Sequence, residues 1–149
     1  MGTLEAALAA MRGQSVYFDT NVFIYFLEGD ERYFEKCLPF FQAAQEGSIR
    51  AVSGDLVIAE LLVKPMRVND MIGAGKVRAL FDDTGCFRAL PHDRSTLELA
   101  AHIRATQKLS MIDAIHLATA IKAKCSHIIT NDEQVAKRAR GITAIRLEA

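Results

Sequence analysis

The sequence lacks several features that would assign the protein to a particular class. It has no tryptophan, three prolines, three cysteines, and equal numbers of acidic and basic residues, 18 of each. Cys37, Cys86 and Cys125 are scattered, and no pair has the spacing of a zinc finger or a redox motif, so we expect reduced thiols. The balanced charge excludes a globally basic nucleic-acid binder, so any contact with nucleic acid must come from a local patch.

Other functional signatures are also missing. No apolar run reaches the roughly 18 residues that a membrane span needs, so we expect no membrane partner and a cytoplasmic location. The sequence has no glycine-rich phosphate loop and no serine or cysteine nucleophile motif. His92, His102, His116 and His127 lack the paired spacing of a zinc site, so we expect them on the surface or partly buried. We expect His116 at the border of a site, without a catalytic role.

What is present is the composition of one ordinary globular domain. The 149 residues are half apolar and about a quarter charged, which is enough to bury a core without disulfides or metal. Short apolar runs alternate with segments of helical periodicity. We expect strands at 14–18, 49–53, 86–90, 126–130 and 143–147. We expect helices at 3–12, 21–28, 31–46, 55–64, 68–82, 93–107, 110–124 and 132–140.

This alternation predicts an α/β fold with three layers. A central, mostly parallel five-stranded sheet would have helices on both faces. The helix that begins at residue 55 should end before Pro65. We divide the chain into a helical N-terminal extension, residues 1–14, and one domain, residues 15–149.

Four acidic residues occupy positions that suggest a common site. Asp19 follows the first predicted strand, inside the apolar stretch SVYFDTNVFIYFLEG, and Asp132 follows the fourth. Parallel sheets bind ligands at this carboxyl edge. Glu60 and Asp113 lie in helices among apolar neighbours. Four converging carboxylates would need a compensating charge, and hard divalent cations such as Mg²⁺ and Mn²⁺ prefer such oxygen ligands.

Each acidic residue also has a simpler explanation. Asp19 and Asp132 could be helix caps, and Asp113 suits the first turn of a helix because of the helix dipole. Glu60 lies in mid-helix, where it has no capping role, although it could face solvent. Two groups of basic residues could contact phosphates or simply be solvated, namely Lys64, Arg67, Lys76 and Arg78, and Lys137, Arg138, Arg140 and Arg146.

Taken in order, these motifs resemble those of the PIN-domain ribonucleases, and especially of the VapC-type toxins of bacterial and archaeal toxin–antitoxin pairs. The family begins with an apolar strand and Asp-Thr-Asn, here residues 19–21. A helical Glu follows in VIAELL, then a helix-borne Asp in MIDAIHLATA, then Thr-x-Asp after a strand, here residues 130–132. The match runs from about residue 15 to 147. Val135 stands where family members often carry an aromatic residue.

The resemblance implies an activity and a set of site residues. The activity is Mg²⁺- or Mn²⁺-dependent endoribonuclease cleavage, which leaves a 5′-phosphate on the RNA product. The implied catalytic residues are Asp19, Glu60, Asp113 and Asp132, and the implied metal ligands are Asp19, Asp113 and Asp132. The implied supporting residues, which cap a helix or orient ligands and water, are Thr20, Asn21 and Thr130.

The resemblance also implies an RNA substrate, a homodimer and a small antitoxin protein. An alternative is a PIN-fold RNA-binding or RNA-processing protein that is not part of a toxin–antitoxin pair. A phosphotransferase of the haloacid dehalogenase type is disfavoured, because Asn21 stands where it needs a second aspartate. Divalent-dependent RNA cleavage separates the enzyme from an inactive binding module.

Overall fold

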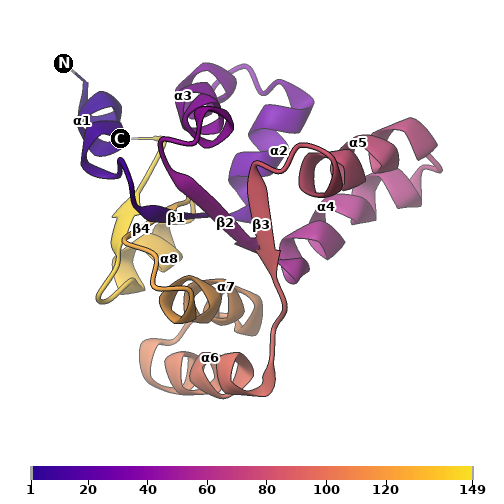
Figure 1. The fold of residues 1–149 in the computed structure, drawn as a ribbon. Helices are drawn as coiled ribbons and strands as arrows, with labels where there is room; N and C mark the ends of the chain where they lie inside the picture. Colours follow the sequence, from indigo (N-terminus) through magenta and orange to yellow (C-terminus); the bar gives the residue numbers. More distant parts are fainter. Residues whose placement is uncertain (1, 149) are drawn as a thin grey trace.

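The computed structural model describes residues 2–148 and contains a parallel sheet between layers of helices (Figure 1). The strands are β1 (Ser15–Phe18), β2 (Arg50–Gly54), β3 (Phe87–Leu90), β4 (His127–Ile129) and β5 (Thr143–Ile145). The helices are α1 (Thr3–Ala10), α2 (Thr20–Glu28), α3 (Phe34–Glu46), α4 (Asp55–Arg67), α5 (Met71–Asp82), α6 (Arg94–Gln107), α7 (Met111–Lys122) and α8 (Glu133–Arg138). The predicted α/β class and five-stranded sheet are confirmed, and every strand pair is parallel.

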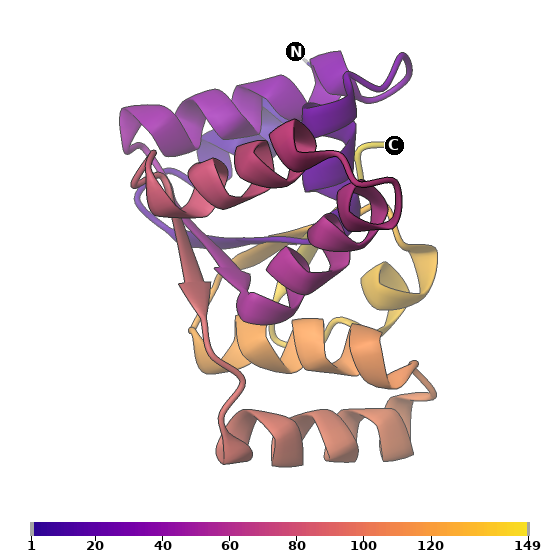
Figure 2. The same cartoon turned by 90° about the vertical axis from the view of Figure 1, so that its right-hand side faces the viewer.

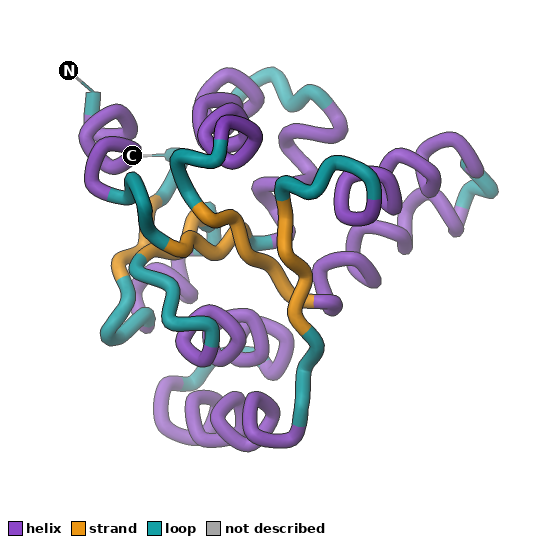
Figure 3. Tube along the Cα trace, viewed as in Figure 1, coloured by secondary structure: helices purple, strands orange, loops and turns teal. Residues whose placement is uncertain are grey.

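Helices cover both faces of the sheet, which makes three layers with one additional helix. Helices α1, α2 and α3 lie over one face, α7 lies under the other, and α6 packs on the outside of α7 (Figures 1 and 2). The α4–α5 hairpin extends sideways from the β3 side of the sheet, as the tube in Figure 3 also shows. None of the helices in residues 2–148 has the length and apolar character needed to cross a membrane.

The side chains of β1 alternate between two hydrophobic cores. Val16 and Phe18 belong to the core beneath α2 and α3, whereas Tyr17 belongs to the core beneath α7. Phe18 meets Phe41 and Phe87 edge-on, with ring centroids 5.3 and 5.2 Å apart. The central strand is therefore anchored on both faces, and the hydroxyl of Tyr17 points toward the α7 side.

The strand order, β3-β2-β1-β4-β5, reverses direction between β1 and β4. The chain reaches β2 from β1 over one face and reaches β4 through α6 and α7 on the other. Ligand sites in parallel α/β sheets lie at such a reversal, beyond the carboxyl ends of the strands. The N–H of Asp19 donates to the carbonyl of Ile129 at 3.0 Å, so the first residue after β1 lies beside the last residue of β4.

Helix α4 continues through Pro65 to Arg67, so the predicted end before this proline is wrong. Proline removes one backbone hydrogen bond. The N–H of Val68 nevertheless bonds to the carbonyl of Lys64, and α4 packs along α5. Tertiary packing thus offsets the lost bond, and α3 likewise contains a proline, Pro39, in its interior.

The N-terminal segment packs against the α3 side of the core. Leu4 and Leu8 of α1 contact this core, and Met11, just after the helix, is completely buried. The N–H of Gly13 donates to the carbonyl of Ser48 at 2.7 Å, which joins the segment to the loop before β2. The division into an extension and a domain stays a prediction.

Candidate active site

Asp19 lies at the carboxyl end of β1, and both of its carboxylate oxygens are held. The side chain is nearly buried. Oδ1 accepts a hydrogen bond from the N–H of Thr20 at 2.8 Å, and Oδ2 accepts one from the hydroxyl of Thr130 at 2.7 Å. Asp19 is also the N-cap of α2. Capping and a place at the sheet edge are therefore compatible roles for this residue.

Thr130 links Asp19 to Asp132. Its buried hydroxyl donates to Asp19 and accepts from the N–H of Asp132 at 3.0 Å. Oδ1 of Asp132 caps α8 by accepting from the N–H groups of Gln134 and Val135, at 2.8 and 3.0 Å. Among residues 2–148, every hydrogen bond to this carboxylate ends on Oδ1, so Oδ2 is left for a ligand.

Asn21 lies in the first turn of α2 and supports the site by holding the loop after β4. Its Oδ1 accepts from the N–H of Asn131 at 3.2 Å, and Nδ2 of Asn131 donates to the hydroxyl of Tyr25 at 3.3 Å. These bonds connect the start of α2 to the loop that carries Asp132. Asn21 thus positions the backbone at Asn131. Of the predicted supporting residues, it is the one whose side chain bonds to no acidic side chain of the described site.

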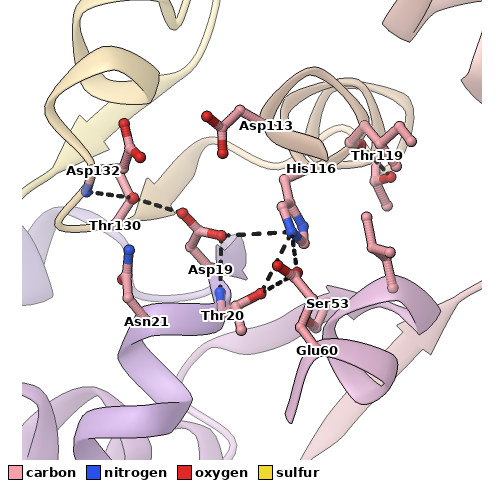
Figure 4. Close-up of polar contacts among 12 residues, drawn as sticks. Asp19, Thr20, Asn21, Ser53, Glu60, Asp113, His116, Thr119, Thr130 and Asp132 are labelled. Carbon is pink, nitrogen blue, oxygen red and sulfur yellow. Dashed lines mark hydrogen bonds and ion pairs between the residues drawn. The ribbon is translucent and has the colours of Figure 1, made fainter. Parts of the chain in front are cut away.

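Glu60 points from α4 toward the start of α2 and the middle of α7 (Figure 4). Its Oε1 accepts from the hydroxyl of Thr20 and lies the same distance, 2.7 Å, from Nε2 of His116. Burial alone would raise the pKa of Glu60, but the hydrogen bonds from His116 and Thr20, with the positive charge of His116, lower it overall. The carboxylate is held in its charged form, and its contacts with Thr20 and His116 turn Oε1 toward the site and away from solvent.

His116 is almost completely buried, so the expectation of a surface or partly buried histidine is wrong for this residue. Besides its contact with Glu60, Nε2 lies 3.9 Å from Oδ1 of Asp19, and Nδ1 shares a hydrogen bond of 2.7 Å with the hydroxyl of Tyr17. The sequence feature that could place His116 near the site is its spacing of three residues from Asp113, which puts both on one helix face. Nothing in the sequence paired it with Tyr17.

Asp113 lies in the first turn of α7, where its N–H donates to the capping hydroxyl of Ser110 at 3.1 Å. Burial raises the pKa of Asp113, the hydrogen bond from Ser110 opposes this, and the negative charges of Asp132 and Asp19 raise the pKa further. In Figure 4, Asp113 lies above Asp19, with Asp132 to one side. The structure thus brings acidic residues from four distant segments to one edge of the sheet.

Comparison with known families identifies the fold. The family model for the PIN domain matches residues 16–141. The chain belongs to the PIN domain family. PIN domains are in general nucleases that use divalent metal ions.

Solved structures agree with the PIN fold. A toxin–antitoxin complex from Klebsiella pneumoniae matches at 20% identity over 89% of this chain and 97% of that one, with a TM-score of 0.68. FitAcB from Neisseria gonorrhoeae matches at 18% identity over 89% and 98%, with a TM-score of 0.69. VapBC2 from Rickettsia felis, bound to a DNA fragment from its promoter, matches at 13% identity over 89% and 98%, with a TM-score of 0.68. A search of curated proteins found no significant match.

The donor set of this PIN domain suits a hard divalent cation. Asp19, Asp113 and Asp132 offer oxygen atoms only, and the mutual repulsion seen at Asp113 is what a bound cation relieves. Within residues 2–148, no three histidine, cysteine or acidic side chains are already arranged to hold a metal ion. A cation held there would need these carboxylates to turn toward it.

Proposed function

We propose that this PIN domain protein is a metal-dependent endoribonuclease and the toxin of a toxin–antitoxin pair. The observation that carries the proposal is the meeting of Asp19, Glu60, Asp113 and Asp132 at the point where the strand order reverses. The raised pKa of Asp113, caused by burial and by neighbouring carboxylates, is the electrostatic mark of such a site.

The residues fit distinct roles in phosphodiester hydrolysis. Asp19, Asp113 and Asp132 would hold Mg²⁺ or Mn²⁺, which when bound neutralises the carboxylates and stabilises charge on the phosphate. Glu60 is the candidate general base, because its charged form is favoured and Oε1 is fixed by two hydrogen bonds. Glu60 would take a proton from water as the new O–P bond forms and the P–O3′ bond breaks. The leaving O3′ takes up a proton from solvent, so the products carry a 5′-phosphate and a 3′-hydroxyl.

Two lysines near Glu60 could contact the RNA backbone. Lys64 and Lys76 line a groove of about 320 Å³ that also includes Glu60. Lys64 is exposed and forms an ion pair of 2.6 Å with Glu28. Phosphate contacts from lysine position a nucleic acid without reading its sequence. This arrangement supports an RNA substrate that approaches from the α4–α5 side.

The nuclease activity is tested with purified protein and end-labelled single-stranded RNA. We expect cleavage with Mn²⁺ or Mg²⁺, none with chelator, and products with a 5′-phosphate. Asp19→Asn, with the same fold by circular dichroism, should be inactive. A wild-type protein that leaves RNA intact under all metal conditions would overturn the proposed ribonuclease activity.

The same groove supports a protein partner. It lies between α2 and the α4–α5 hairpin, with Ile24, Leu61 and Val77 among its apolar lining. The hairpin also exposes large apolar side chains, namely Val63, Met66, Val68, Met71 and Ile72. An antitoxin segment could cover these side chains and place a basic group against the acidic site. That structural neighbours occur in toxin–antitoxin complexes supports this choice of partner.

The antitoxin is tested by co-expression with the adjacent short reading frame. We expect a stable complex in which RNA cleavage is suppressed. Separate elution with unchanged activity would favour the alternative, an RNA-processing PIN protein outside a toxin–antitoxin pair. The homodimer stays a prediction from the family resemblance, and light scattering of the free protein measures it.

A further inference from the structure

Two histidine side chains connect α7 to α4 across the carboxyl edge of the sheet. His116 of α7 contacts Glu60, as described above. His92, in the loop before α6, accepts from the N–H of Leu56 through Nε2 at 3.0 Å, and its Nδ1 lies 3.0 Å from the hydroxyl of Thr119. Both connections end on α4, the first in its interior and the second in its first turn.

The protonation of the His116 connection follows from its partners. A carboxylate only accepts hydrogen bonds, so Nε2 of His116 must carry the proton that it shares with Glu60. In the neutral ring, Nδ1 then accepts from the hydroxyl of Tyr17. The hydroxyl of Tyr17 thus donates to His116, and His116 donates to Glu60. This buried hydrogen-bond chain runs from β1 through α7 to α4.

Tyr17 is the fixed end of this hydrogen-bond chain, and Gly54 of β2 leaves room beside it. Tyr17 lies in the central strand and is completely buried, so its hydroxyl has a constant position. A Cβ atom at Gly54 would lie 2.5 Å from the ring of His92 and 3.2 Å from the hydroxyl of Tyr17. Glycine at this position therefore makes room for both side chains.

Glu60 lies at the other end of this hydrogen-bond chain, which determines the orientation of its side chain. Its side chain has three rotatable bonds and is 30 % exposed, whereas that of His116 is 2 % exposed. All the hydrogen bonds that Glu60 makes within residues 2–148 end on Oε1, from Thr20 and His116. These two donors come from different helices, so together they determine the direction of the unbonded Oε2.

We propose that His116, supported by Tyr17, is a positioning residue that fixes Oε1 of Glu60 so that Oε2 faces the attacking water. This inference rests on the proposed ribonuclease function. Both residues are buried, so they would act through Glu60 and not by contact with RNA. Partners that orient metal-ligating side chains typically contribute about 10- to 100-fold to activity, and we expect an effect of the same order for a partner of Glu60.

The second connection supplies a matched control. Thr119 is one turn after His116 on α7, is equally buried, and joins the same helices through His92 without contacting Glu60. Thr119→Val removes this connection with little change in side-chain shape. If His116 had only a structural role, replacing His116 and replacing Thr119 would change RNA cleavage equally. If His116 positions Glu60, only the replacement of His116 lowers cleavage.

The experiment measures kcat and KM for RNA cleavage in folded variants. We expect His116→Leu and Tyr17→Phe to lower kcat by about 10- to 100-fold with KM little changed, and Thr119→Val to keep the wild-type kcat. His116→Gln, which keeps a donor for Glu60, should recover part of the lost kcat. In a Glu60→Gln background, His116→Leu should cause no further loss, because its effect passes through Glu60.

Two results would overturn the inference and leave the ribonuclease assignment intact. One is a wild-type protein that cleaves RNA while His116→Leu keeps the kcat of Thr119→Val. The other is an undiminished effect of His116→Leu in the Glu60→Gln background. A wild-type protein without cleavage overturns the proposed function and the inference together. If His116→Leu does not fold, Tyr17→Phe and His116→Gln carry the test, and wild-type kcat in both overturns the inference.

Discussion

The hydroxyl of Thr130 donates to Oδ2 of Asp19 at 2.7 Å, across 111 residues of sequence. We predict that Thr130→Val destabilises the protein by about 1–3 kcal/mol, because it leaves Oδ2 of Asp19 and the N–H of Asp132 without their partner. RNA cleavage should fall as well, since Asp19 loses its fixed orientation. Urea unfolding and cleavage rates measure both effects. Thr130→Ser keeps the hydroxyl and should stay near wild type, so equal losses in both variants would contradict the prediction.

A second prediction concerns the pH dependence of stability. Burial alone would lower the pKa of His116, but the hydrogen bond to Glu60 and the charges of Asp19, Glu60 and Asp113 raise it overall. Its stabilisation is therefore complete below the unfolded-state pKa of 6.5 and is lost as the pH rises through the folded-state pKa. We expect the free energy of unfolding of wild type to fall over this range relative to His116→Gln. Parallel pH profiles in urea unfolding would contradict this.

The sequence predicted the elements that local patterns determine. The strand that ends at Phe18, followed by Asp19 as a cap, could be located because apolar runs and capping residues are local signals. The predicted start of the helix at residue 110 was locatable in the same way, because Ser110 caps α7. The contact between Tyr17 and His116 could not be predicted, because 99 residues separate them and only the strand order brings them together.

Helix α7 shows that hydrophobic periodicity cannot always predict which residues of a helix are buried. An apolar face along residues 112, 115, 118, 119 and 121 is the pattern that the sequence suggests for this helix, yet the side chain of Ile112 is exposed. The helix lies between the sheet and α6, so residues on several of its sides are buried, among them Ala114, Leu117 and Ala118. A helix with two apolar sides has no single face that a 3.6-residue period can identify.

A third prediction concerns the thiols. Burial raises the pKa of Cys37 and of Cys125 to about 12, whereas Cys86 is only partly buried. The thiolate is the reactive form, so iodoacetamide at pH 8 should modify Cys86 alone in the native protein. All three cysteines should react after unfolding in urea. Mass spectrometry of the intact protein measures the number of adducts, and rapid native labelling of Cys37 would contradict the described core.

The last prediction separates a ligand role for Asp113 from a helix-dipole role. Burial and the charges of Asp132 and Asp19 raise its pKa, so the native protein binds this proton more tightly than the unfolded chain and loses stability as Asp113 ionises. At neutral pH, Asp113→Asn should therefore raise the melting temperature of the metal-free protein. The carboxylate is only half-buried, so solvent screening keeps the increase small, on the order of 1 °C.

The same variant should show a smaller rise in melting temperature with Mn²⁺, because ligand binding to the native state produces that rise. Asp83→Asn, an exposed substitution at the end of α5, should keep the full Mn²⁺ effect. Melting curves with chelator and with saturating Mn²⁺ give all the values needed. A lower metal-free melting temperature for Asp113→Asn, together with an undiminished Mn²⁺ effect, would assign Asp113 to the first turn of α7 as a dipole-stabilising residue and remove it from the metal site.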